Sequence, residues 1–163
     1  MEYLKIETNI FKLKSMEQKY APIWIEIKGE KFPENNWYDF IYSVLNIWNY
    51  SLLEMLKTQK SECVLNFVEG DFAFKFEKKQ GFLYYVYLGR LDIYENVFTK
   101  KNYYNNEVIT INLIEFINEL LTTSNDLLKY SELNKISNDD FNTFRIKFLK
   151  YKKEIANFVN NPI

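Results

Sequence analysis

The sequence predicts an α+β fold, a mainly antiparallel sheet of about five or six strands packed with three helices. Three observations support this class. Segments in which apolar and polar residues alternate, as in strands, fill most of the first 90 residues. Three longer segments carry apolar residues at helical spacing. The strands and helices do not alternate regularly along the chain, which favours α+β over α/β.

Length and charge predict one domain, residues 1–163, without a nucleic-acid or membrane partner. A chain of this size buries about two-thirds of its unfolded surface, so it needs neither a disulfide nor a metal to fold. The net charge of -1 provides no overall field to attract nucleic acid or an anionic membrane. The single cysteine, Cys63, and the absence of a visible signal peptide or spanning segment predict a cytoplasmic protein.

The first strands are predicted from apolar residues at every second position. Residues 2–14 read as one strand or as two bent strands. In residues 21–29, three isoleucines alternate with larger or charged side chains, and Gly29 ends the strand.

The next segment predicts an amphipathic helix that begins at Trp37 and continues for about six turns. Asn36 is the predicted N-cap, and Asp39 stands three residues later, in the first turn. There its carboxylate would favour the positive end of the helix. Asp39 beside a tryptophan also fits an acid in a cleft, but we favour the structural role. Trp37 and Trp48 lie on the apolar side and are predicted core residues.

Residues 62–90 predict a three-stranded meander whose turns lie at 69–71 and 79–81. Cys63 faces inward in this pattern, so we expect a buried and unreactive thiol. The third strand, residues 82–89, is predicted to be covered on both faces, because its two faces are hard to tell apart.

The remaining residues predict a short strand and two helices. Residues 92–98 fit another strand, and residues 100–107 read as an exposed loop. Residues 108–111 predict a short strand that leads into a helix at Asn112, and a last helix begins near Ser137. The chain is acidic from 107 to 140 and basic from 141 to 154, which fits two neighbouring solvated helices better than a nucleic-acid site.

The residue inventory argues against enzymatic chemistry. The chain contains no histidine, which removes the commonest general base and the commonest metal ligand. Four scattered glycines cannot form a phosphate-binding loop. A zinc site would need four ligands from one cysteine and carboxylates. We therefore expect no catalytic residues, no metal and no cofactor.

Exposed acids and tyrosines are the candidate partner-binding residues. Tyrosine is enriched where proteins meet proteins, because it brings contact area at small entropic cost. The same residues also fit ordinary loops of a tyrosine-rich chain. The candidates are Glu69, Asp71, Asp92, Tyr94, Glu95, Tyr103 and Tyr104.

Part of the sequence resembles a group of small bacterial proteins, some of which are immunity proteins that block a toxin. The resemblance rests on Phe32-Pro33, Trp37, Asp39-Phe40, Val44-Leu45 and Trp48, followed by "NFVEGDF" at residues 66–72. It covers residues 30–90. In this group a proline or small residue usually follows the glycine of the turn, whereas Asp71 follows here. The resemblance implies a structural Trp-Asp helix head and a non-enzymatic role, and it transfers no binding residue.

These observations lead to one functional hypothesis and two alternatives. The hypothesis is a protein-binding module, an immunity protein that covers the active surface of a basic toxin domain. The first alternative is a ligand-binding or enzymatic domain with a pocket lined by Tyr84, Tyr85 and Tyr87. The second is a structural subunit of an assembly, which would expose a large apolar patch.

Overall fold

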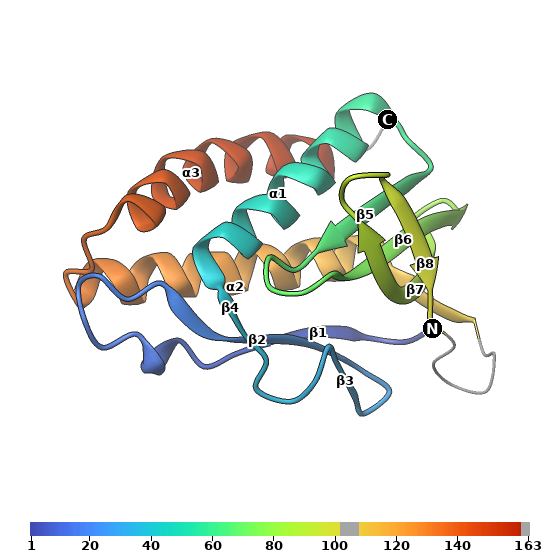
Figure 1. Ribbon diagram of the computed structural model, residues 1–163. Coiled ribbons are helices and arrows are strands. Elements are labelled where there is room, and N and C mark those ends of the chain that lie inside the picture. Colours follow the sequence, from blue (N-terminus) through green and yellow to red (C-terminus); the bar gives the residue numbers. More distant parts are fainter. Residues whose placement is uncertain (102–107, 161–163) are drawn as a thin grey trace.

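The computed structural model describes residues 1–101 and 108–160. Within these residues, three α-helices pack with two antiparallel sheets of four and five strands, which confirms the predicted α+β class. The strands divide between two sheets where the sequence suggested one. One isolated bridge, between Glu2 and Ile111, connects them. In Figure 1, α1 and α3 lie on one side, the first sheet lies on the other, and α2 runs between them.

The first sheet has the order β1-β2-β3, and β4 also pairs with β2. Its strands are β1 (Leu4–Thr8), β2 (Tyr20–Ile27), β3 (Glu30–Phe32) and β4 (Tyr38–Phe40). Ile6 stands opposite Ile25 in the β1–β2 pair, so both strands turn their apolar faces to the core. The predicted strand over residues 2–14 is shorter, because a 3₁₀ turn follows it at Ile10–Lys12.

Helix α1 (Ile41–Thr58) begins four residues after Trp37, where the sequence predicted its start. Residues 38–40 form β4 instead, because Phe40 pairs with Tyr20 and Tyr38 pairs with Pro22. Asn36 is therefore not the N-cap and adopts a positive φ of 57°. A non-local strand pairing thus overrides the local helical pattern.

The second sheet contains the predicted meander, with order β5-β6-β7-β8. Its strands are β5 (Glu62–Asn66), β6 (Phe72–Gln80), β7 (Leu83–Asp92), β8 (Val97–Lys100) and β9 (Ile109–Asn112). The first half of β7 pairs with β9 and its second half pairs with β8.

The prediction that β7 is covered on both faces is wrong. Tyr84 is buried, whereas Tyr85 and Tyr87 on the opposite face are only half-buried. Lys79 lies 5.2 Å from the ring centre of Tyr85, and Lys100 lies 4.7 Å from that of Tyr87. Tyrosine suits such a face, because its ring packs against lysine stems while its hydroxyl reaches water.

Helices α2 (Leu113–Leu133) and α3 (Asp139–Asn160) follow, close to the predicted positions. Asn112 caps α2 by accepting a hydrogen bond from the Ile114 N–H. Asn138, one residue after the predicted Ser137, accepts from the Phe141 N–H at 2.9 Å. None of the helices within the described residues combines the length and the apolar character needed to span a membrane.

The core joins both sheets and all three α-helices through aromatic side chains. Trp48 of α1 is fully buried, and its ring meets Phe67 at 5.2 Å and Phe74 at 5.1 Å in edge-to-face contacts. Phe116 of α2 meets Phe76 at 4.9 Å. The core therefore fixes the second sheet against α1 and α2 and leaves one end of that sheet free to project.

Candidate functional site

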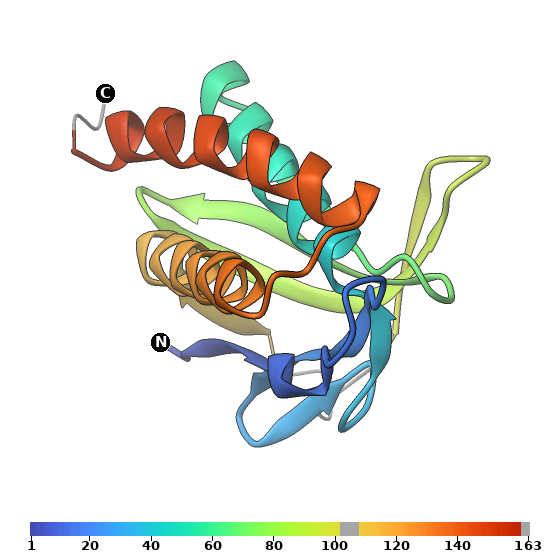
Figure 2. The same ribbon diagram turned by 90° about the vertical axis from the view of Figure 1, so that its left-hand side faces the viewer.

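Five of the predicted partner-binding residues lie at one end of the second sheet. Glu69 and Asp71 belong to the turn between β5 and β6. Asp92, Tyr94 and Glu95 belong to the β7–β8 hairpin. That hairpin projects beyond the rest of the molecule, as Figure 2 shows at its right-hand side. The remaining two, Tyr103 and Tyr104, lie outside the described residues.

The tip of the hairpin is a tight turn that Asp92 organises. Asp92 stands opposite Val97 at the last strand pair. Its Oδ1 accepts hydrogen bonds from the Tyr94 N–H at 2.9 Å and the Glu95 N–H at 3.0 Å. Asn96 completes the turn with a positive φ of 54°. Asp92 therefore shapes the tip as well as contributing charge to it, a role that the sequence analysis did not predict.

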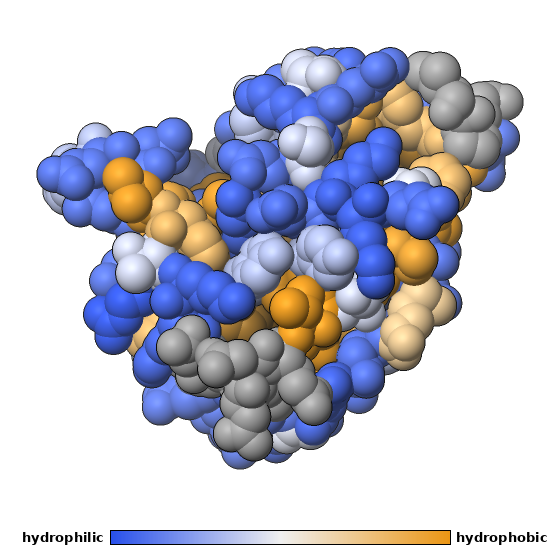
Figure 3. Space-filling view, turned by 90° about the vertical axis from the view of Figure 1, so that its right-hand side faces the viewer, coloured by the Kyte–Doolittle hydropathy of each residue, from blue (hydrophilic) through white to orange (hydrophobic). Residues whose placement is uncertain are grey.

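The hairpin tip exposes apolar side chains. Tyr94 is fully exposed at 100%, Ile93 at 63% and Val97 at 51%. Apolar atoms are visible on the projecting arm in Figure 3, between polar neighbours. Exposed apolar groups that cluster within a polar rim are typical of interaction sites. Ile93 and Val97 were missed from the sequence, because an apolar residue in a strand pattern is expected to face the core.

The hairpin and the β5–β6 turn together form an open hollow of about 440 Å³. Asp71, Asp92 and Tyr94 all line it, so the structure brings these three predicted residues together. Arg90, which the sequence analysis did not single out, forms an ion pair with Asp71 at 3.0 Å and lies over the ring of Phe72 at 5.1 Å. The pair holds the turn against the hairpin.

Glu69 and Glu95 do not line the hollow. Glu69 faces the first sheet, where burial and then the Glu69 charge raise the pKa of Tyr20. Glu95 is exposed on the hairpin turn. The two carboxylates extend the acidic character of this end of the molecule to either side of the hollow.

Asp39 holds the β5–β6 turn from below. Its side chain is completely buried and accepts from the Val68 N–H at 3.0 Å and the Glu69 N–H at 3.1 Å. It also accepts from the Phe40 N–H at 2.7 Å and from Trp37 Nε1 at 3.3 Å. Burial raises the pKa of the Asp39 carboxyl, and these hydrogen bonds oppose the shift. Asp39 therefore has a structural role, but its predicted position in the first turn of the helix is wrong, because Asp39 lies in β4 and holds a distant turn.

Gly89 allows β8 to lie close to β7. A Cβ atom at this position would stand 2.2 Å from the carbonyl oxygen of Thr99. Glycine within a strand often marks such a close approach of two backbones. Gly89 was therefore the available sequence signal for the hairpin.

The described residues at this end of the second sheet carry side chains suited to binding another molecule. They contain no group of three histidine, cysteine, aspartate or glutamate side chains arranged to hold a metal ion. Burial raises the pKa of Cys63 to about 12, so its thiol stays protonated at neutral pH. The surface itself presents carboxylates, a tyrosine and aliphatic side chains.

We define the acidic–aromatic surface as Glu69, Asp71, Asp92, Ile93, Tyr94, Glu95 and Val97.

Comparisons of this chain with protein-family models, with curated proteins and with solved structures found no match.

Proposed function

We propose that this chain is a non-enzymatic protein-binding module, and that it acts as an immunity protein by covering a basic toxin domain of bacterial origin. The observation that carries the proposal is the projecting β7–β8 hairpin, whose tip exposes Tyr94, Ile93 and Val97. Exposed side chains of this kind contribute to binding when a partner removes them from water, at about 1.5–3 kcal/mol for a fully buried aliphatic side chain.

Charge supports a basic partner. Within the described residues, the carboxylates of Glu69, Asp92 and Glu95 form no ion pair, while Asp71 is paired with Arg90. The acidic–aromatic surface is therefore negative around its apolar centre. Complementary charge speeds association and excludes partners of like charge. Toxin domains that act on nucleic acid often carry the positive surface that would complement it.

The contacts that hold the β5–β6 turn and the β7–β8 hairpin in place also support a role in binding. Asp39 fixes the β5–β6 turn, and the Asp71–Arg90 pair joins that turn to the hairpin. A surface that is already ordered loses less conformational entropy on binding. The residue inventory supports a non-enzymatic role, because the chain has no histidine and its single thiol is buried and protonated.

The test requires a toxin-like reading frame beside the gene of this chain, and it uses the domain which that reading frame encodes. Tyr94→Ala is expected to weaken the complex by about 30-fold or more, because truncation of a central aromatic residue commonly costs about 2 kcal/mol or more. Tyr50→Ala is the matched control, because Tyr50 is 50% exposed on α1, outside the acidic–aromatic surface. Calorimetry measures the affinities, and growth during co-expression measures protection from the toxin.

Two results would contradict the proposal. The first is a toxin domain that binds wild type and Tyr94→Ala with equal affinity. The second is a neighbouring toxin domain that the wild-type chain neither binds nor neutralises.

A further inference from the structure

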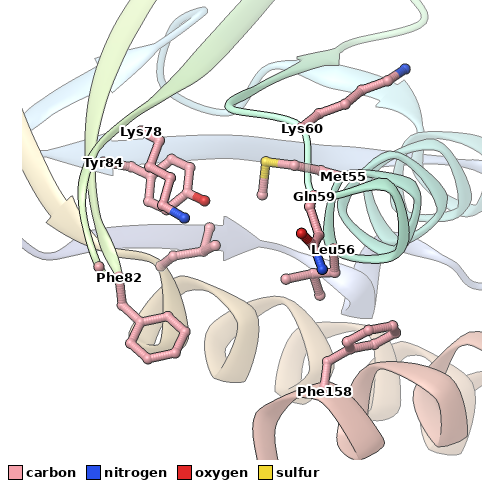
Figure 4. A pocket seen from close by; sticks show the side chains of 10 residues that line it. Met55, Leu56, Gln59, Lys60, Lys78, Phe82, Tyr84 and Phe158 are labelled. Atoms are coloured by element: carbon pink, nitrogen blue, oxygen red, sulfur yellow. The ribbon is translucent and has the colours of Figure 1, made fainter. Parts of the chain in front are cut away.

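A pocket distinct from the acidic–aromatic surface lies where α1 ends, beside the β6–β7 turn and the last turns of α3 (Figure 4). Its volume is about 260 Å³. Its walls are part apolar and part polar. Met55, Leu56, Phe82, Leu113 and Phe158 form the apolar part, and the polar part comes from Gln59, Lys60, Lys78 and Tyr84. A dry apolar cavity of about 150 Å³ holds one benzene molecule, so this pocket has room for a small organic ligand.

A hydroxyl group that forms no hydrogen bond with the described residues lines this pocket. Tyr84 is only 5% exposed, yet its hydroxyl makes no hydrogen bond to the described residues. In Figure 4 the hydroxyl points into the space between β7 and α1. A hydroxyl that faces an open pocket is available to donate a hydrogen bond to whatever occupies that pocket. The Tyr84 hydroxyl is therefore an available hydrogen-bond donor on the pocket wall.

The charged groups around the Tyr84 hydroxyl favour a ligand that carries a hydrogen-bond acceptor. Burial raises the pKa of Tyr84, so the hydroxyl keeps its proton and can donate it. The Lys78 ammonium group points into the same space and forms no ion pair with the described residues. No aspartate or glutamate is among the described residues that line the pocket. Two donors without a carboxylate favour an anionic group on the ligand.

We propose that this pocket binds a small amphipathic monocarboxylate. The carboxylate accepts hydrogen bonds from the Tyr84 hydroxyl and the Lys78 ammonium group. The apolar body, of about eight carbon atoms by comparison with the benzene cavity, lies among Met55, Leu56 and Phe158. This site is separate from the acidic–aromatic surface, and the inference does not depend on the proposed function.

The side-chain methyl group of Met55 provides a direct reporter. The chain has three methionines. Met55 is 3% exposed and lines the pocket, whereas Met1 and Met16 are 73% and 57% exposed and serve as internal controls. Sodium octanoate is titrated into protein labelled with ¹³C at the methionine methyl groups. A saturable shift of the Met55 signal alone is expected, with a Kd of about 1 mM or lower.

Three further probes separate the two halves of the ligand. Octan-1-ol has the same chain without the charge and is expected to bind about tenfold more weakly, because it loses the charge-assisted hydrogen bonds. Acetate and inorganic phosphate provide the charge without the chain and are expected to leave Met55 unshifted. Equal shifts with octanoate and octan-1-ol, or equal shifts with octanoate and phosphate, would overturn the proposal.

Matched variants on one hairpin test the two donors. Tyr84→Phe keeps the buried ring and removes only the hydroxyl, and Lys78→Gln removes the positive charge. Each is expected to weaken octanoate binding about tenfold. Tyr85→Phe and Lys79→Gln are the controls, because these two residues contact one another on the opposite face. Unchanged binding by Tyr84→Phe, or no Met55 shift in wild type, rules out this site.

Discussion

Asp39 shows how one buried carboxylate can stabilise a surface to which it does not belong. It joins the end of β4 to the β5–β6 turn through three partly buried backbone N–H donors, those of Phe40, Val68 and Glu69. The sequence predicted a structural role for this residue, because it stands in a polar position before an apolar run. It could not predict the partners, because Val68 and Glu69 are 29 and 30 positions away in the chain.

Replacing Asp39 is expected to destabilise the protein strongly. Asp39→Asn keeps the shape but turns an amide group toward several N–H donors. We expect the free energy of unfolding to fall by about 2–4 kcal/mol, the range for a broken buried hydrogen-bond network. Asp71→Asn is the control, because its ion pair is about half exposed and should cost at most about 1 kcal/mol. Urea denaturation measures both, and equal losses would contradict this role for Asp39.

The burial of the Cys63 thiol can be tested through the pH dependence of stability and through the reactivity of the thiol. Its folded-state pKa is about 12 against an ordinary value of 9.0, because burial disfavours the thiolate. The contribution of the protonated Cys63 thiol to the free energy of unfolding is therefore complete below about pH 9, and it is lost as the pH rises toward about 12. A thiol reagent at pH 8 should modify the native protein far more slowly than the urea-unfolded chain. Equal rates would show that Cys63 is accessible.

At the scale of elements, periodicity predicted which segments become strands and helices, but not where they end. The helix over residues 37–57 starts later, because three of its residues pair with β2. Strand β7 was assigned two covered faces, because tyrosine is both aromatic and polar. Its division between β9 and β8 depends on pairings with later residues, which no local pattern contains. The β7–β8 hairpin could have been predicted more sharply from Gly89.

Gly89→Ala tests the close approach of these two strands. The added methyl group would meet the Thr99 carbonyl oxygen at 2.2 Å, so β8 must move away from β7. We expect a loss of about 1–3 kcal/mol, typical of inserting a methyl group into a tightly packed site. The NMR cross-peaks between Arg90 and Thr99 should weaken, while those between Phe74 and Leu88 persist. Unchanged cross-peaks for both pairs would contradict the steric argument.

At the scale of the whole molecule, the sequence predicted the α+β class correctly, because alternation and helical spacing are local properties. The division into two sheets was not predictable, because it depends on how α1 separates β4 from β5. The candidate surface was partly predictable from its exposed acids and Tyr94. Its apolar members, Ile93 and Val97, were not, because exposure depends on how far the hairpin extends beyond β6.

The central claim is that this protein acts through the acidic–aromatic surface at the end of its second sheet. Hydrogen–deuterium exchange of the full chain, with and without a toxin domain encoded by a neighbouring reading frame, tests it most directly. The account predicts that bound toxin slows exchange in the turn at residues 68–71 and in the hairpin at residues 91–99, while α3 exchanges as before. Slowed exchange confined to the helices, with the hairpin unaffected, would contradict the claim.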